Sequence, residues 1–228
     1  MNFDPFIFAL LGGILPAFVW LLFWLREDWR HPEPNRLILR TFLFGMVAVM
    51  LVIPLQQQIA NFLPGAFALQ IILWALAEEL FKFCAGYFGG IHSVDDNEPI
   101  DPLVYMLTAA LGFVAIENTL FILGPLMGSD TIQGLITGNM RFIGASLLHV
   151  VSSGIMGAYI SFSFYKRRAG KRRAAMKGLF WATLFHAGFN LLILYKEEMG
   201  LMAAFVAVWI GVAVLLWTFE KIKGIAAN

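Results

Sequence analysis

The sequence predicts an all-α, polytopic transmembrane helical bundle, and three observations carry this prediction. First, 60% of the 228 residues are apolar and only 14% are charged, whereas soluble domains are about half apolar and one quarter charged. Second, the apolar runs have the length of helices and lack the two-residue alternation of β-barrel strands. Third, polar or Pro/Gly-rich segments separate these runs. The chain is therefore expected to cross a membrane several times.

About seven spans are expected, because seven apolar runs approach or exceed the length needed to cross a hydrocarbon core roughly 30 Å thick. They lie at residues 5–25, 37–55, 66–90, 102–127, 136–165, 178–195 and 200–219. The first is expected to be a retained helix, since it has neither a basic segment before it nor a small-residue cleavage site after it. Breaks are expected at QQQIANFLPG and at KRRAGKRRAAMK, and none of the breaks has room for a soluble domain.

The basic residues predict an N-out, C-in orientation, because lysine and arginine are retained on the cytoplasmic side. With the N-terminus outside, 13 of the 16 basic residues fall on the inner side, and only Arg141 and Lys196 fall on the outer side. The remaining one, Lys82, lies within a span. The KRRAGKRRAAMK segment is interpreted as a topology determinant that touches anionic lipid headgroups. No nucleic-acid partner is expected, and the cell membrane is the expected location.

Ionisable side chains inside the spans are the candidate functional residues, because each is expensive in lipid, at roughly 2.5–3.5 kcal/mol on insertion scales. Six are present: Glu78, Glu79, Lys82, Glu117, His149 and His186. At 1.5 Å per helical residue, the glutamates and histidines of four separate spans lie about 14–18 Å from the outer ends of those spans. They are therefore expected to form one layer. Mutual pairing that only holds the helices together is the structural alternative.

The charges of this layer do not balance within the expected spans. Three carboxylates face one ammonium, which leaves the layer at −2 when both histidines are neutral. Lys82 can pair with Glu78 or Glu79 on its own helix. Glu117 has Phe113 and Phe121 on its face, so its partner must come from across the bundle. A proton or a cation is needed to compensate the remaining charge.

Activation of a water molecule is the chemistry that this residue set favours. A glutamate can act as general base and then as general acid, while a histidine helps to orient the water. His186 and Asn190 share one helix face at a spacing of four residues, so they could stabilise a tetrahedral oxyanion. Zinc bound by the same side chains is the alternative that the residues leave open, although no H-E-x-x-H helix is present. The single cysteine, Cys84, is interpreted as a packing residue.

Four short motifs resemble those of a known family. They are EELFK at 78–82, IENTLF at 116–121, His149 in SLLHVVSSG and HAGFN at 186–190. In order and spacing they are similar to the PrsW-type intramembrane proteases, which are related to the CAAX prenyl endopeptidase superfamily of glutamic proteases. The resemblance implies a single transmembrane protease domain over residues 1–228, with its core at 66–195.

The resemblance also implies roles for the matching residues. Glu78 corresponds to the water-activating base, assisted by His149, and Glu79 and Glu117 to essential acidic partners. His186 and Asn190 correspond to the oxyanion site. The implied substrate is a single-pass membrane protein, such as an anti-sigma factor, cleaved near its extracytoplasmic side in a prokaryotic plasma membrane. A prenylated substrate is not expected, because EExxK replaces the EExxxR of the CAAX enzymes.

Two other functions use the same side chains. A proton-coupled transporter also carries intramembrane glutamates and histidines, but the sequence shows no inverted repeat. A zinc-dependent membrane hydrolase of the lipid-amidase type needs a third histidine within the spans, which the chain does not supply. A glutamic-type intramembrane protease without a cofactor is therefore the prediction, and no oligomeric state is predicted.

Overall fold

The computed structural model describes residues 4–28, 32–128, 131–195 and 197–225, and these residues form helices with no strand among them. The helices are α1 (Pro5–Glu27), α2 (Asn35–Phe62), α3 (Phe67–Gly86), α4 (Asp101–Met127), α5 (Thr131–Met140), α6 (Ser146–Ser161), α7 (Arg168–Tyr195) and α8 (Glu197–Lys223). Two π-helical turns, Tyr87–Ile91 and Arg141–Ala145, follow α3 and join α5 to α6. The prediction of an all-α bundle is confirmed.

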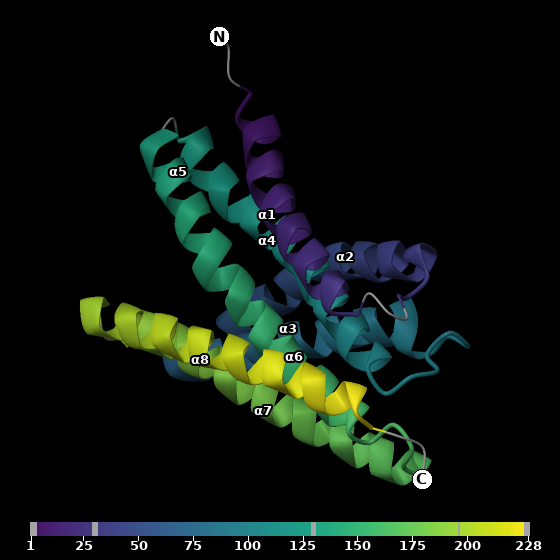
Figure 1. The fold of residues 1–228 in the computed structure, drawn as a ribbon. Helices are drawn as coiled ribbons and strands as arrows, with labels where there is room; N and C mark the ends of the chain where they lie inside the picture. The colour runs from purple at the N-terminus through teal and green to yellow at the C-terminus, as the bar shows by residue number, and fades with distance from the viewer. Residues whose placement is uncertain (1–3, 29–31, 129–130, 196, 226–228) are drawn as a thin grey trace.

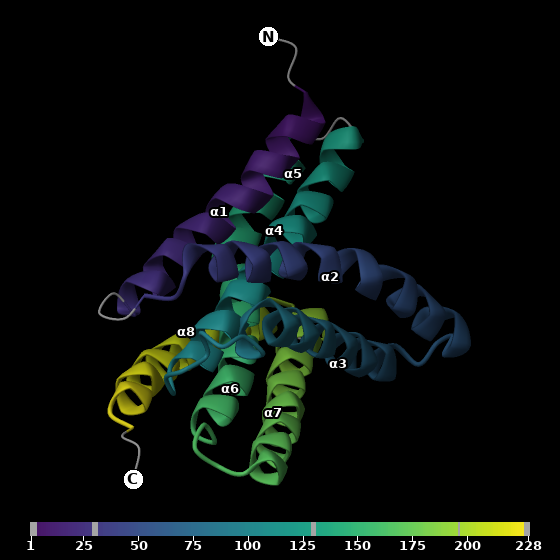
Figure 2. The ribbon, with the colours of Figure 1, turned by 90° about the vertical axis from the view of Figure 1, so that its right-hand side faces the viewer.

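Helix α4 is the centre of the bundle. Its first 15 residues are all buried, and it packs against α1, α2, α3 and α6 (Figures 1 and 2). Helices α6 and α7 pack together, and α8 lies over both of them (Figure 1). The outward faces of α1, α2, α7 and α8 carry exposed apolar side chains, as a lipid-facing surface requires.

Two glycines let α2 and α4 cross at close range. A Cβ built on Gly112 would meet the backbone carbonyl of Phe42, and one built on Gly45 would meet the carbonyl of Ala109. Because neither contact leaves room for a methyl group, the two backbones touch at this crossing. This contact fixes α2 beside the helices that carry the ionisable layer.

Six helices are long and apolar enough to cross a membrane, which is one fewer than the sequence predicted. They are α1, α2, α4, the continuous helix Ile132–Ser161 that includes α6, α7 and α8. The expected third span forms α3, a helix of 20 residues, but Glu78, Glu79 and Lys82 make it too highly charged to count among the six. The N-out, C-in orientation stays a prediction.

Two of the expected breaks are wrong. Helix α2 continues through Gln56 and ends at Phe62, and α7 begins at Arg168, ten residues before the expected start of its span. Glutamine, lysine, arginine and alanine are all good helix formers. Polar composition therefore marks where a helix leaves an apolar environment, and it does not mark where the helix ends.

Candidate active site

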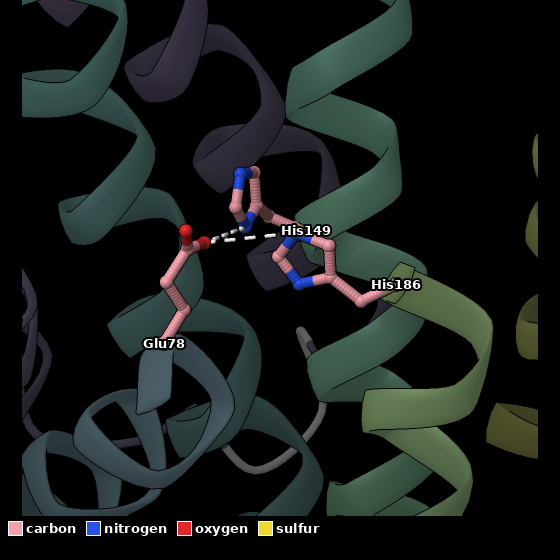
Figure 3. A group of neighbouring side chains, drawn as sticks. All are labelled: Glu78, His149 and His186. Carbon is pink, nitrogen blue, oxygen red and sulfur yellow. Dashed lines mark ion pairs between the residues drawn. The ribbon is translucent and has the colours of Figure 1, made fainter. Parts of the chain in front are cut away.

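Four helices bring the predicted ionisable residues together. Helix α3 supplies Glu78 and Glu79, α4 supplies Glu117, α6 supplies His149 and α7 supplies His186. Figure 3 shows Glu78, His149 and His186 pointing toward one another from three of these helices. Apart from Glu117, whose side chain is 18% exposed, all of these side chains are at least nine-tenths buried. The layer expected from the sequence is therefore one connected cluster.

Glu79 is the most heavily hydrogen-bonded carboxylate of the cluster. Its Oε1 accepts from Lys82 Nζ at 2.5 Å, from His186 Nδ1 at 2.8 Å and from the hydroxyl of Ser152 at 2.8 Å. Its Oε2 accepts from the hydroxyl of Ser153 at 3.0 Å. Four donors from three helices satisfy this fully buried anion, as a charge in a low-dielectric interior requires. Glu79 thus ties α3, α6 and α7 together.

Glu117 obtains its partners from across the bundle, as the sequence predicted. Arg141 Nη2 donates to its Oε2 at 2.5 Å, and His149 Nε2 lies 3.0 Å from the same oxygen. Arg141 also donates from Nε to Asn118 Oδ1 at 2.7 Å, and its guanidinium lies 3.9 Å from the centre of the Phe121 ring. The π-helical turn that begins at Arg141 places this side chain beside α4.

The predicted charge of −2 is corrected to −1, because Arg141, which was counted on the outer side and not in the layer, belongs to the cluster. Lys82 pairs with Glu79, and Arg141 pairs with Glu117. Among the described residues, neither a lysine nor an arginine forms an ion pair with Glu78. Glu78 is therefore the carboxylate whose charge is left without a permanent cation.

The two oxygens of Glu78 have different surroundings. Oε1 accepts a hydrogen bond of 2.8 Å from Gln56 Nε2 on α2. Oε2 is buried without a hydrogen-bond partner, and it lies 3.6 Å from His186 Nε2 and 4.0 Å from His149 Nδ1 (Figure 3). A buried oxygen in this state lacks the stabilisation that it would have in water. It is the point of the cluster where a water molecule or a proton is most needed.

Hydrogen-bond partners assign the protons of both histidines. The Glu79 carboxylate can only accept, so His186 carries a proton on Nδ1, and the neutral ring turns the lone pair of Nε2 toward Glu78. The ammonium of Lys82 can only donate, and it lies 2.8 Å from His149 Nδ1, so His149 carries its proton on Nε2 and donates to Glu117. His149 is therefore occupied on both nitrogens, whereas His186 presents one free lone pair.

The donor set of Glu78, His149 and His186 is of the type that zinc prefers, and one ligand atom from each lies within 4.8 Å of the others. However, the nitrogen of His149 that faces Glu78 already accepts from Lys82. One lone pair cannot serve an ammonium and a metal at the same time. As arranged, the side chains offer two free ligand atoms and do not fit a three-ligand zinc site.

The structure also places residues that the sequence did not predict as site residues. Gln56, Arg141, Ser152 and Ser153 all donate to the glutamates of the cluster. The spacing of Ser153 from His149 by four residues was the one available signal, since it places both on the same face of α6. Asn190, the expected oxyanion residue, lies half-buried one turn after His186 and takes no part in the hydrogen bonds described above.

Comparison with known proteins identifies the family. Residues 33–218 match the family model described as PrsW family intramembrane metalloprotease. A Protease PrsW of Geobacillus kaustophilus (strain HTA426) is 30% identical over 198 residues, which cover 85% of this chain and 84% of that protein. A Protease PrsW of Halalkalibacterium halodurans is 25% identical over 223 residues, covering 95% of this chain and 97% of its own length.

A third relative, a Protease PrsW of Bacillus subtilis (strain 168), is 26% identical over 181 residues, with 78% of this chain and 76% of that protein covered. No solved structure matches the chain. The family model extends over the helices that carry the ionisable cluster. The chain therefore belongs to the PrsW family and is a membrane protease.

Proposed function

We propose that this protease hydrolyses a peptide bond of a single-pass membrane protein with a water molecule that Glu78 activates. The observation that carries the proposal is the pairing of charges in the cluster. Glu79 and Glu117 each have a permanent cation, and Glu78 has none. A carboxylate held by a lysine or an arginine is a weak base, so Glu78 is the one carboxylate available to accept a proton.

A water molecule held by both Glu78 and His186 is the nucleophile that we propose. Glu78 Oε2 and His186 Nε2 both present lone pairs, and 3.6 Å separates them. Two acceptors at this distance repel each other unless a hydrogen lies between them. A water molecule that donates to both would satisfy them and would keep its own lone pairs free for attack. Glu79 supports this arrangement, because its hydrogen bond to Nδ1 holds His186 in the required tautomer.

The reaction then follows from the roles of general base and general acid. Glu78 accepts a proton from the water as the water oxygen bonds to the carbonyl carbon of the substrate. The tetrahedral intermediate collapses when the carbon–nitrogen bond breaks, and Glu78 returns the proton to the leaving amine. Lys82 and Arg141 keep Glu79 and Glu117 ionised, so these two carboxylates hold the histidines and do not compete for the proton.

The position of the cluster supports the proposed substrate class. Its glutamates and histidines lie on buried segments of a helical bundle that crosses a membrane, so the scissile bond must reach them within or close to the bilayer. A membrane-anchored protein meets this requirement, and an anti-sigma factor in a bacterial plasma membrane is the example that we propose. The proposed mechanism uses no metal ion, because Lys82 donates to His149 Nδ1, the atom that would have to serve as the third zinc ligand.

The test is cleavage of a panel of single-pass membrane proteins in proteoliposomes, read by intact mass. Wild-type protein is compared with itself in the presence of a chelator, and liposomes without protein serve as the control. Fragments that persist with chelator are the expected result, and their masses give the depth of the cut. Fragments lost with chelator and restored by zinc would favour the zinc-dependent alternative, in which Glu78, His149 and His186 would have to rearrange to bind the ion. Absence of fragments from every substrate would contradict the proposal.

A further inference from the structure

Gln56 is held in a fixed position beside Glu78 although it lies in a segment expected to be a break between two spans. Its side-chain Nε2 donates to Glu78 Oε1 at 2.8 Å, and its backbone carbonyl accepts from the indole of Trp74 at 3.1 Å. Both partners lie on α3, so the residue is attached to the helix of the catalytic glutamate at two points. Its neighbours Gln57 and Gln58 are exposed, whereas Gln56 is half-buried.

The orientation of the Gln56 amide follows from its partner. A carboxylate oxygen only accepts, so the nitrogen of the amide faces Glu78 and the amide oxygen does not. An amide nitrogen carries two hydrogens, and Glu78 takes one of them. Within the described part of the chain, no second acceptor is recorded for this nitrogen. One N–H of Gln56 is therefore available to another oxygen next to Glu78.

The proposed hydrolysis needs a donor at this place. The negative charge that develops on the substrate carbonyl oxygen must be met by hydrogen-bond donors that are already oriented. Neutral His186 donates only from Nδ1, and that hydrogen bond goes to Glu79. His149 donates to Glu117. Asn190 makes none of the hydrogen bonds of the cluster, so it stays the donor expected from the sequence, and a second donor is needed beside it.

On the basis of the proposed function, we infer that Gln56 is a catalytic residue that donates one N–H to the oxyanion while its other N–H orients Glu78. Its neutrality suits both tasks. A lysine at this position would pair with Glu78 and weaken it as a base, whereas an amide holds the carboxylate without supplying a full charge. The amide nitrogen of Gln56 would thus both hold the general base, Glu78, and donate to the oxyanion beside it.

The test compares Gln56→Met, an isosteric apolar change, with Gln57→Met in the proteoliposome cleavage assay. Loss of one oxyanion donor typically lowers kcat by about 10²–10³-fold. We expect a loss of this size for Gln56→Met, with KM changed less than about threefold and with the protein still folded, although the unpaired Glu78 Oε1 lowers its unfolding temperature. Gln57→Met should retain wild-type kcat and KM. Gln56→Glu keeps the shape but replaces the donor with an acceptor, so it should also lose kcat.

A second readout separates a catalytic role from a structural one. A peptide aldehyde forms a hydrate that mimics the tetrahedral intermediate, and the corresponding uncleavable peptide mimics the substrate. Gln56→Met should weaken binding of the aldehyde by a factor similar to its loss of kcat, with binding of the peptide unchanged. Cleavage by Gln56→Met at the wild-type kcat, or equal weakening of both ligands, would overturn the inference. Absence of cleavage by the wild-type protein would instead refute the proposed function on which it rests.

Discussion

Replacement of Lys82 by methionine is expected to destabilise the fold by about 3 kcal/mol, toward the lower end of the range for breaking a buried ion pair. The ammonium of Lys82 is completely buried and lies 2.5 Å from Glu79 and 2.8 Å from His149 Nδ1. Methionine has similar length but no charge, so Glu79 becomes a buried anion without a cation. Because Glu79 keeps the hydrogen bonds of His186 and two serines, part of its charge stays satisfied.

The double variant Lys82→Met/Glu79→Gln isolates the pair. Neutral glutamine removes the uncompensated charge, so the double variant should be more stable than Lys82→Met alone by about 1–2 kcal/mol. The assay is denaturant unfolding of the purified protein in detergent micelles, with all four members of the double-mutant cycle. Lys223→Met is the matched control, because its pair with Glu220 is exposed and should contribute less than about 1 kcal/mol. If the free energies of unfolding lost by Lys82→Met and by Glu79→Gln simply added in the double variant, the proposed charge pairing would be refuted.

Three further changes test other parts of the structure. Arg141→Met leaves Glu117 without its cation and should lower the free energy of unfolding by about 1–3 kcal/mol, measured by the same unfolding assay. Gly112→Ala pushes a methyl group into the backbone of α2 and should destabilise by about 1–3 kcal/mol, whereas Gly124→Ala, which meets open space, should be neutral in thermal unfolding. Burial raises the pKa of Glu33, outside the spans, from 4.5 to about 8. The folded protein therefore holds a proton that the unfolded chain has released, so the free energy of unfolding should fall as the pH rises from about 5 to 8, and Glu33→Gln should flatten this slope.

The helices could be predicted from the sequence because hydropathy reports directly on burial in lipid. Their ends could not be predicted in the same way. The segments 56–62 and 168–177 are polar yet helical, since the residues there are good helix formers. The expected third span, α3, differs from the six long apolar helices because it carries the three charges of the candidate site.

The ionisable layer was predictable because an unpaired charge in a membrane helix has a large energetic penalty. The partners of that layer were not. Gln56 is neutral and lies at the polar end of α2, so nothing in the sequence marked it as a site residue. Arg141 was counted only as a basic residue of the outer side, and the π-helical turn at 141–145 brings it to Glu117. The oxyanion pair of His186 and Asn190, inferred from helical spacing and the HAGFN motif, stays a prediction, because helical spacing does not reveal the tautomer of a histidine.

The cleavage rate of Glu78→Gln tests the central claim most directly, provided that its unfolding temperature is measured beside it. Glutamine keeps the shape of the side chain but cannot accept a proton from water. The account predicts cleavage at least about 10³-fold slower than wild type, with an unfolding temperature that is unchanged or higher. Glu220→Gln, an exposed change on α8, should cleave at the wild-type rate. Cleavage by Glu78→Gln at more than about one tenth of the wild-type rate would contradict the assignment of Glu78 as the general base.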